Sequence, residues 1–173
     1  MTSPSLKIKL PYNLQEVPSF CGTLSQAKKI TFGKLHILFQ INRFYDRSKR
    51  NGYCMVTSNY NTGLLAAAEY GLKPECHIYK YSNRQLVQSF QMDTTVKCIG
   101  MAFSRDGKYL IMIGGVPDFR ISVYDVENKK KLVIPETKLP CKPEEFLQVK
   151  FNPANQNQFC ILSQTVLYSF TIH

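Results

Sequence analysis

The feature that most constrains this 173-residue chain is a unit of about 45 residues that occurs three times. Its clearest copy spans residues 103–125. There a strand-like segment, a turn at Asp106 and Gly107, a second strand, a loop and a third strand follow one another, and the copy ends on Tyr124 and Asp125. A repeat of this length, with several strands per unit and an aromatic residue before an Asp, is typical of one blade of a WD-type β-propeller.

Corresponding positions recur in the other copies at nearly constant spacing. Tyr79 precedes Tyr124 by 45 residues. Gly63 precedes Gly107 by 44 residues, and both lie in turn-forming sequences, because Gly accepts positive φ and Asx side chains bond their own backbone. The repeat therefore predicts structural blade positions, which are Tyr79, Asp106, Gly107, Asp118, Tyr124 and Asp125.

The predicted fold is all-β: a partial WD40-type β-propeller of about three to four antiparallel blades that does not form a closed ring. Residues 61–173 are expected to hold the blades, with the last one incomplete. Residues 1–60 are expected to form a divergent basic segment, with a partial blade as the alternative. Because a repeat unit cannot bury both of its faces alone, we expect a truncated or fragmentary chain that self-associates through open blade edges.

Positive charge is concentrated at the start of the chain. The formal net charge is +10, and residues 1–60 hold nine Lys or Arg residues against two acidic ones. This excess favours an acidic partner such as nucleic acid, anionic lipid or a tubulin wall, and a solvated basic face is the ordinary alternative. A nucleic-acid-binding module at residues 28–53 is therefore an alternative function. The candidate charged contacts, which are interleaved with aromatic residues, are Arg43, Arg47, Lys49 and Arg50.

No motif for catalysis, metal binding or a cofactor is present. The six cysteines stand at least 19 residues apart without any CxxC pair, and the three histidines flank no cysteine pair. This spacing argues against zinc and favours buried free thiols. Neither a GxGxxG nor a GxxxxGK[ST] phosphate loop occurs. We also find no signal-peptide pattern and no apolar run of about 18 residues. The sequence predicts an intracellular, non-enzymatic protein without cofactor, metal or membrane partner.

Three segments of the repeat resemble the WD-repeat cilia- and flagella-associated proteins, above all the axonemal tether-head type. They are AAAEYGLKPECHIYKY at 66–81, AFSRDGKYL at 102–110 and VPDFRISVYD at 116–125. The resemblance covers roughly 70 residues. It implies a scaffold in axoneme assembly and dynein tethering, located in the cytoplasm and cytoskeleton of motile cilia or sperm flagella. The implied partners are other axonemal or WD-repeat proteins, the microtubule doublet and dynein.

Departures from the WD pattern predict weaker blades. Tyr124 stands where the pattern has Trp, and its ring and polar tip suit the same slot. In WD blades an Asp at the position of Asp118 accepts a hydrogen bond from a His at the start of the blade, but this chain has no Gly-His pair. Asp93 and Thr94 occupy that neighbourhood instead, so we expect an incomplete network and less rigid blades.

Overall fold

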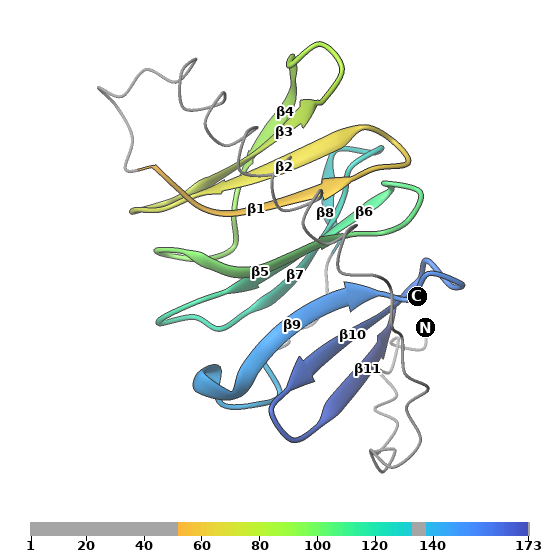
Figure 1. Ribbon diagram of the computed structural model, residues 1–173. Coiled ribbons are helices and arrows are strands. Elements are labelled where there is room, and N and C mark those ends of the chain that lie inside the picture. Colours follow the sequence, from red (N-terminus) through yellow and green to blue (C-terminus); the bar gives the residue numbers. More distant parts are fainter. Residues whose placement is uncertain (1–51, 133–137, 173) are drawn as a thin grey trace, which may run out of the picture.

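Three antiparallel sheets lie one on another in the computed structural model, which describes residues 52–132 and 138–172 (Figure 1). In each sheet the strands pair with their neighbours in chain order, so each sheet is an up-and-down meander. The first sheet contains β1 (Tyr53–Asn59), β2 (Leu64–Glu69), β3 (Glu75–Lys80) and β4 (Leu86–Gln91). The second contains β5 (Cys98–Phe103), β6 (Tyr109–Gly114), β7 (Ile121–Asp125) and β8 (Lys130–Leu132). The 3₁₀ turn η1 (Pro143–Glu145) precedes the third sheet, which contains β9 (Phe146–Phe151), β10 (Gln158–Ser163) and β11 (Leu167–Thr171).

The three sheets are arranged as successive blades. The first strands of neighbouring sheets contact each other, β1 with β5 and β5 with β9, while the later strands extend outward (Figure 1). Two four-stranded sheets and one three-stranded sheet form an open array among the described residues. This confirms the predicted all-β, partial propeller architecture. We call the sheets blades 1, 2 and 3.

Backbone hydrogen bonds repeat with the predicted period. In every blade the residue after the third strand of the meander donates its N–H to a carbonyl in the turn between the first two strands, at 2.7–2.8 Å. Successive bonds are 45 or 46 residues apart at the donor, which shows that the sequence repeat is a structural repeat. These bonds join Tyr81 to Gly63, Val126 to Lys108 and Ile172 to Asn157.

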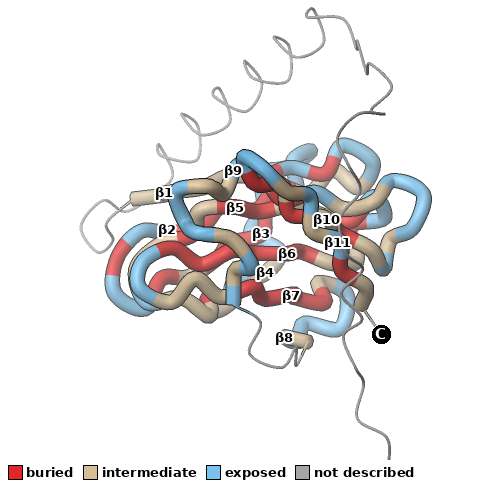
Figure 2. Tube along the Cα trace, turned by 90° about the horizontal axis from the view of Figure 1, so that it is seen from below, coloured by how far each residue is buried: buried red, intermediate tan, exposed pale blue. Residues whose placement is uncertain are grey.

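Blade 2 lies between two apolar layers. Alternate side chains of β6 point to opposite faces of the sheet, so Leu110 and Met112 pack toward blade 1 whereas Ile111 and Ile113 pack toward blade 3. All four side chains are buried, and Figure 2 shows the buried residues gathered along β5, β6 and β7. The core of the described protein therefore consists of the two interfaces between blades.

The side chains of blade 3 that alternate with its core residues are mostly polar. Val149, Phe159, Ile161 and Phe170 pack toward blade 2, so their sequence neighbours point the other way. Those outward side chains are partly or fully exposed and include Gln148, Lys150, Gln158, Cys160, Leu162, Leu167, Ser169 and Thr171. This face is mixed rather than continuously apolar. The predicted self-association remains a prediction.

The expected boundary at residue 61 falls within a sheet. β1 ends at Asn59 and pairs antiparallel with β2, whose first residue is Leu64. The first blade therefore includes residues on both sides of that boundary. Residues 1–51 lie outside the described residues, so their predicted character stays a prediction.

Candidate interaction site

Two ends of the blades carry the loops on which an interaction protein depends. Because the strands run up and down, the turns β1–β2, β3–β4, β5–β6, β7–β8 and β9–β10 lie at one end, which we call the turn face. The loops β2–β3, β4–β5, β6–β7 and β10–β11 lie at the other end, together with residues 138–145 before β9, and we call this end the linker face. Loops of this kind carry binding residues on a rigid scaffold.

Asp106 and Gly107 form the β5–β6 turn on the turn face. Asp106 Oδ1 accepts hydrogen bonds from Ser104 Oγ at 2.6 Å and from the Lys108 N–H at 3.0 Å. Gly107 has φ +76°, and a Cβ built on it would lie 2.8 Å from Thr62 Cγ2 of blade 1. This glycine thus serves both the turn and the close approach of two blades.

Asparagine side chains connect neighbouring turns across the blades. Asn59 Nδ2 donates to the carbonyls of Ser104 at 2.6 Å and Arg105 at 3.1 Å. Asn61 Nδ2 donates to the same Arg105 carbonyl at 3.2 Å. One blade further on, the Asp106 N–H donates to Gln156 Oε1 at 3.2 Å. Sequence reasoning missed these bonds, although the turn position of Asn59 recurs as Ser104 and Asn152.

On the linker face, Asp118 joins the β6–β7 loop to the connection between blades 1 and 2. Its Oδ2 accepts from Thr95 Oγ1 at 2.5 Å and from the Thr95 N–H at 2.6 Å. Beside it the Gly115 N–H donates to the Lys97 carbonyl at 2.8 Å. The prediction of an incomplete hydrogen-bond network is therefore wrong for this blade. The hydroxyl and the backbone N–H of Thr95 supply the donors that a His supplies in the WD pattern.

These donors also tune the carboxyl group. Hydrogen bonds from the Thr95 side chain and backbone lower the pKa of Asp118, outweighing the opposite effect of its slight desolvation. Arg120 and Thr94 act in the same direction. Asp118 is consequently held as an acceptor that fastens a loop.

Tyr124 lies between blades 1 and 2 as a flat aromatic plate. Its ring stacks on Phe90 with centroids 3.6 Å apart and planes 6° apart. Gln88 Nε2 donates to the Tyr124 hydroxyl at 2.6 Å. The neighbouring Asp125 is buried and accepts from the backbone and side-chain N–H groups of Asn128, both at 2.9 Å. Both residues therefore lie at structural positions of the blade and leave no group facing solvent for chemistry.

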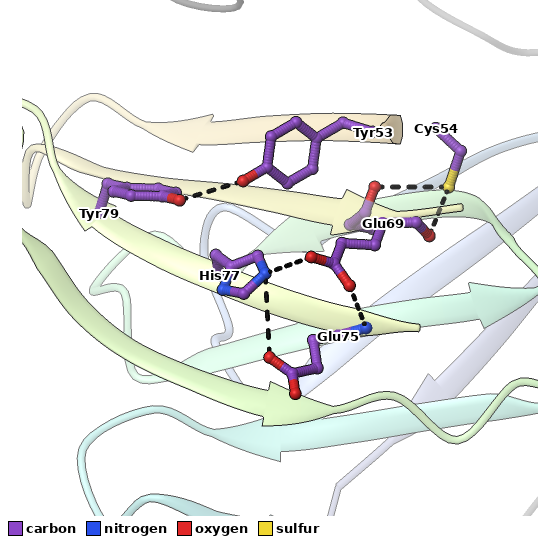
Figure 3. A network of polar contacts seen from close by, with 7 residues as sticks. Tyr53, Cys54, Glu69, Glu75, His77 and Tyr79 are labelled. Carbon is purple, nitrogen blue, oxygen red and sulfur yellow. Dashed lines mark hydrogen bonds and ion pairs between the residues drawn. The ribbon is translucent and has the colours of Figure 1, made fainter. Parts of the chain in front are cut away.

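Tyr79 belongs to a polar network in blade 1 (Figure 3). Its hydroxyl lies 3.1 Å from the hydroxyl of Tyr53. Nearby, His77 Nε2 is 2.8 Å from Glu69 Oε1, and Glu69 Oε2 accepts from the Glu75 N–H at 3.2 Å. His77 and Glu69 are 4% and 7% exposed. At that burial the pair holds β2 and β3 together and is closed to a substrate.

Three cysteines, spaced 22 residues apart, lie near one another between blades 1 and 2. Cys54 Sγ donates to the Glu69 carbonyl at 3.3 Å and accepts from the Cys98 N–H at 3.4 Å. Desolvation by burial raises the pKa of Cys98 to about 12 and raises that of Cys76 strongly. These free thiols are structural, because the thiolate that would react or bind a metal is disfavoured.

The predicted charged contacts cannot be placed. Arg43, Arg47, Lys49 and Arg50 lie outside the described residues. Within residues 52–132 and 138–172, no group of three or more His, Cys, Asp or Glu side chains is arranged to hold a metal ion. In the same ranges no helix is long and apolar enough to cross a membrane.

The stacked meanders and their 45-residue repeat define a class of protein, the WD-type β-propeller. The β-propeller domain of Myceliophteria thermophila Cps50 (Swd1) has a similar fold, with a TM-score of 0.50 and 16% sequence identity over 63% of this chain and 30% of that one. No protein-family profile matches the sequence.

One relative with a similar sequence is a protein associated with cilia and flagella. The chain is 23% identical over 122 residues to cilia- and flagella-associated protein 43 of Mus musculus, which covers 68% of this chain and 7% of the relative. The resemblance expected from the sequence, to WD-repeat cilia- and flagella-associated proteins, is thereby confirmed. The chain spans only a small part of the length of either protein.

Proposed function

We propose that this protein is a non-enzymatic WD-repeat scaffold that takes part in axoneme assembly and dynein tethering in motile cilia or sperm flagella. The observation that carries the proposal is the similarity to a cilia- and flagella-associated protein over 122 residues. The proposed partners are other axonemal or WD-repeat proteins, the microtubule doublet and dynein.

The polar groups of the blades support a scaffold role. Asp118 and Asp125 accept hydrogen bonds that fix loops, and the ring of Tyr124 is held by its bond to Gln88. The His77–Glu69 pair is buried between strands. Each of these groups has a structural partner. A rigid frame with exposed loops is what a protein that binds other proteins needs.

Exposed apolar side chains on the linker face offer a contact surface. Leu72 in the β2–β3 loop is 83% exposed, and Val116 in the β6–β7 loop is 58% exposed. These loops occupy equivalent places in blades 1 and 2, and Tyr70 lies beside Leu72 in the first of them. Apolar side chains presented on stapled loops favour a protein partner.

Localisation and binding test the proposal together. A tagged full-length chain is expected to concentrate in the axoneme of ciliated cells and to co-pellet with isolated doublets. Leu72→Glu combined with Val116→Glu should abolish both, because charges replace the apolar contacts. Leu86→Glu combined with Val87→Glu, at positions of β4 that are 53% and 45% exposed and lie outside the linker face, is the matched control and should leave both intact. A uniformly cytosolic wild-type chain that fails to co-pellet would refute the proposal.

A further inference from the structure

The excess positive charge of the described residues lies at the turn face. Six basic residues stand at this end, against the acidic residues Asp106, Asp125 and Glu127. Asp125 is buried and bonded to Asn128, so two acidic side chains remain exposed there. The basic residues of the turn face are Lys80, Arg84, Arg105, Lys108, Lys129 and Lys130.

The linker face is balanced by comparison. Its loops and strand ends carry five basic residues, Lys73, Lys97, Arg120, Lys138 and Lys142, against six acidic ones, Glu69, Glu75, Asp93, Asp118, Glu144 and Glu145, and some of the acidic residues have basic partners. Asp93, for example, bonds Lys131 at 2.5 Å and lies 3.9 Å from Arg120. The asymmetry therefore belongs to one end of the blades and is not a general property of the surface.

Two of the basic residues occupy strained backbone positions. Arg84 has φ +60° in the β3–β4 turn, and Lys129 has φ +53° in the β7–β8 turn. They are equivalent positions, 45 residues apart, in blades 1 and 2. Gly adopts this left-handed conformation most readily and Asn or Asp next, so a long basic side chain there costs stability. Strain of this kind supports a functional role only together with the charge asymmetry, because Lys73 on the linker face is strained as well.

The neighbouring turn presents a third basic side chain on a fixed backbone. The carbonyl of Arg105 accepts hydrogen bonds from both Asn59 and Asn61, so the tip of the β5–β6 turn is held against the β1–β2 turn. Between those two asparagines, Tyr60 is 99% exposed. A fixed tip loses little conformational freedom when it binds a partner.

We propose that the turn face binds an acidic segment of a partner protein, with carboxylates meeting Arg84, Arg105 and Lys129. Exposed Tyr60 and Tyr81 favour a polypeptide, because Tyr and Arg are the side chains that dominate protein interfaces. Exposed Asp106 and Glu127 disfavour the continuous phosphate backbone of a nucleic acid. This inference rests on the proposed scaffold function and names the chemistry of one partner.

Fluorescence anisotropy of the full-length chain with a fluorescein-labelled decaglutamate peptide tests the proposal. Binding should weaken between 50 and 150 mM salt, because exposed charge pairs are screened. Arg84→Gly with Lys129→Gly should raise the Kd about threefold to tenfold. The same variant should melt at an equal or higher temperature, because glycine relieves both strained positions.

A charge-matched control separates this site from general attraction. Lys73 also has positive φ, +52°, but lies on the linker face with Lys142. Lys73→Gly with Lys142→Gln removes the same charge and should leave the Kd within twofold. Equal effects of the two double variants, absence of peptide binding, or tighter binding of a decathymidylate through Arg84 and Lys129 would each overturn the inference. The axonemal test with Leu72 and Val116 addresses the linker face, so the result of the peptide experiment and the result for the proposed function are independent of each other.

Discussion

Gly107→Ala tests the contact between blades 1 and 2 at the turn face. An alanine at φ +76° carries the left-handed strain of a non-glycine residue, about 1–2 kcal/mol. Its Cβ would also lie 2.8 Å from Thr62 Cγ2 and 2.9 Å from Thr62 Oγ1. Thr is β-branched and stiff, so relieving these contacts by rotation or backbone shift costs about 1–2 kcal/mol more. We expect a total loss of about 2–4 kcal/mol in the free energy of unfolding.

Gly63→Ala is the matched control. Gly63 has φ +67°, but no atom lies within 4 Å of a Cβ built on it, so only the conformational strain should appear. The two losses, measured by urea unfolding followed with far-ultraviolet circular dichroism, should differ by about 1–2 kcal/mol. Adding Thr62→Ala to Gly107→Ala should recover about 1 kcal/mol, since it removes both crowding atoms. Equal losses for the two glycines, or no recovery, would refute the reasoning.

Three further outcomes follow from the structure. Asp118→Asn should lower the free energy of unfolding at pH 7. Because the native pKa of Asp118 lies below its unfolded value, the difference in stability between this variant and wild type should fade as the pH drops below about 4. Urea titrations at pH 7 and pH 3 check this, and a difference that stays constant would contradict it. Tyr124→Phe should cost about 1 kcal/mol in thermal unfolding experiments, because Gln88 loses its acceptor, and no change in melting temperature would count against that bond. Native Cys98 should resist alkylation by iodoacetamide at pH 8 until urea is added, as read by mass spectrometry, and rapid native labelling would show that its thiol is accessible.

Repetition made the blades predictable from the sequence. Each unit carries its own turn formers and short β-rich segments, and such local signals depend on neighbours within a few residues. Gly107 in a turn and Tyr124 as an aromatic plate are both of this kind, and the structure places them so.

The bonds between blades were harder to foresee. A template that requires His at the start of a blade overlooks Thr95, although its hydroxyl and backbone N–H bind Asp118 equally directly. Asn59 reaches a carbonyl 45 residues away, and nothing local in the sequence marks that carbonyl as its partner. The left-handed backbone at Arg84 and Lys129 could not be predicted either, because turns of this kind are usually recognised by a Gly and these two contain none at that position.

The sandwiched position of blade 2 gives the protein a graded resistance to opening. The amides of β6 pair with β5 and β7 and lie under apolar layers on both sides, whereas β4 and β11 are outer strands of flanking blades. Units that touch only their neighbours open one at a time, starting from the least supported. Amide protons of β6 should therefore exchange with deuterium last, at a rate set by global unfolding, and the chain should yield to a mechanical pull from its flanking blades inward.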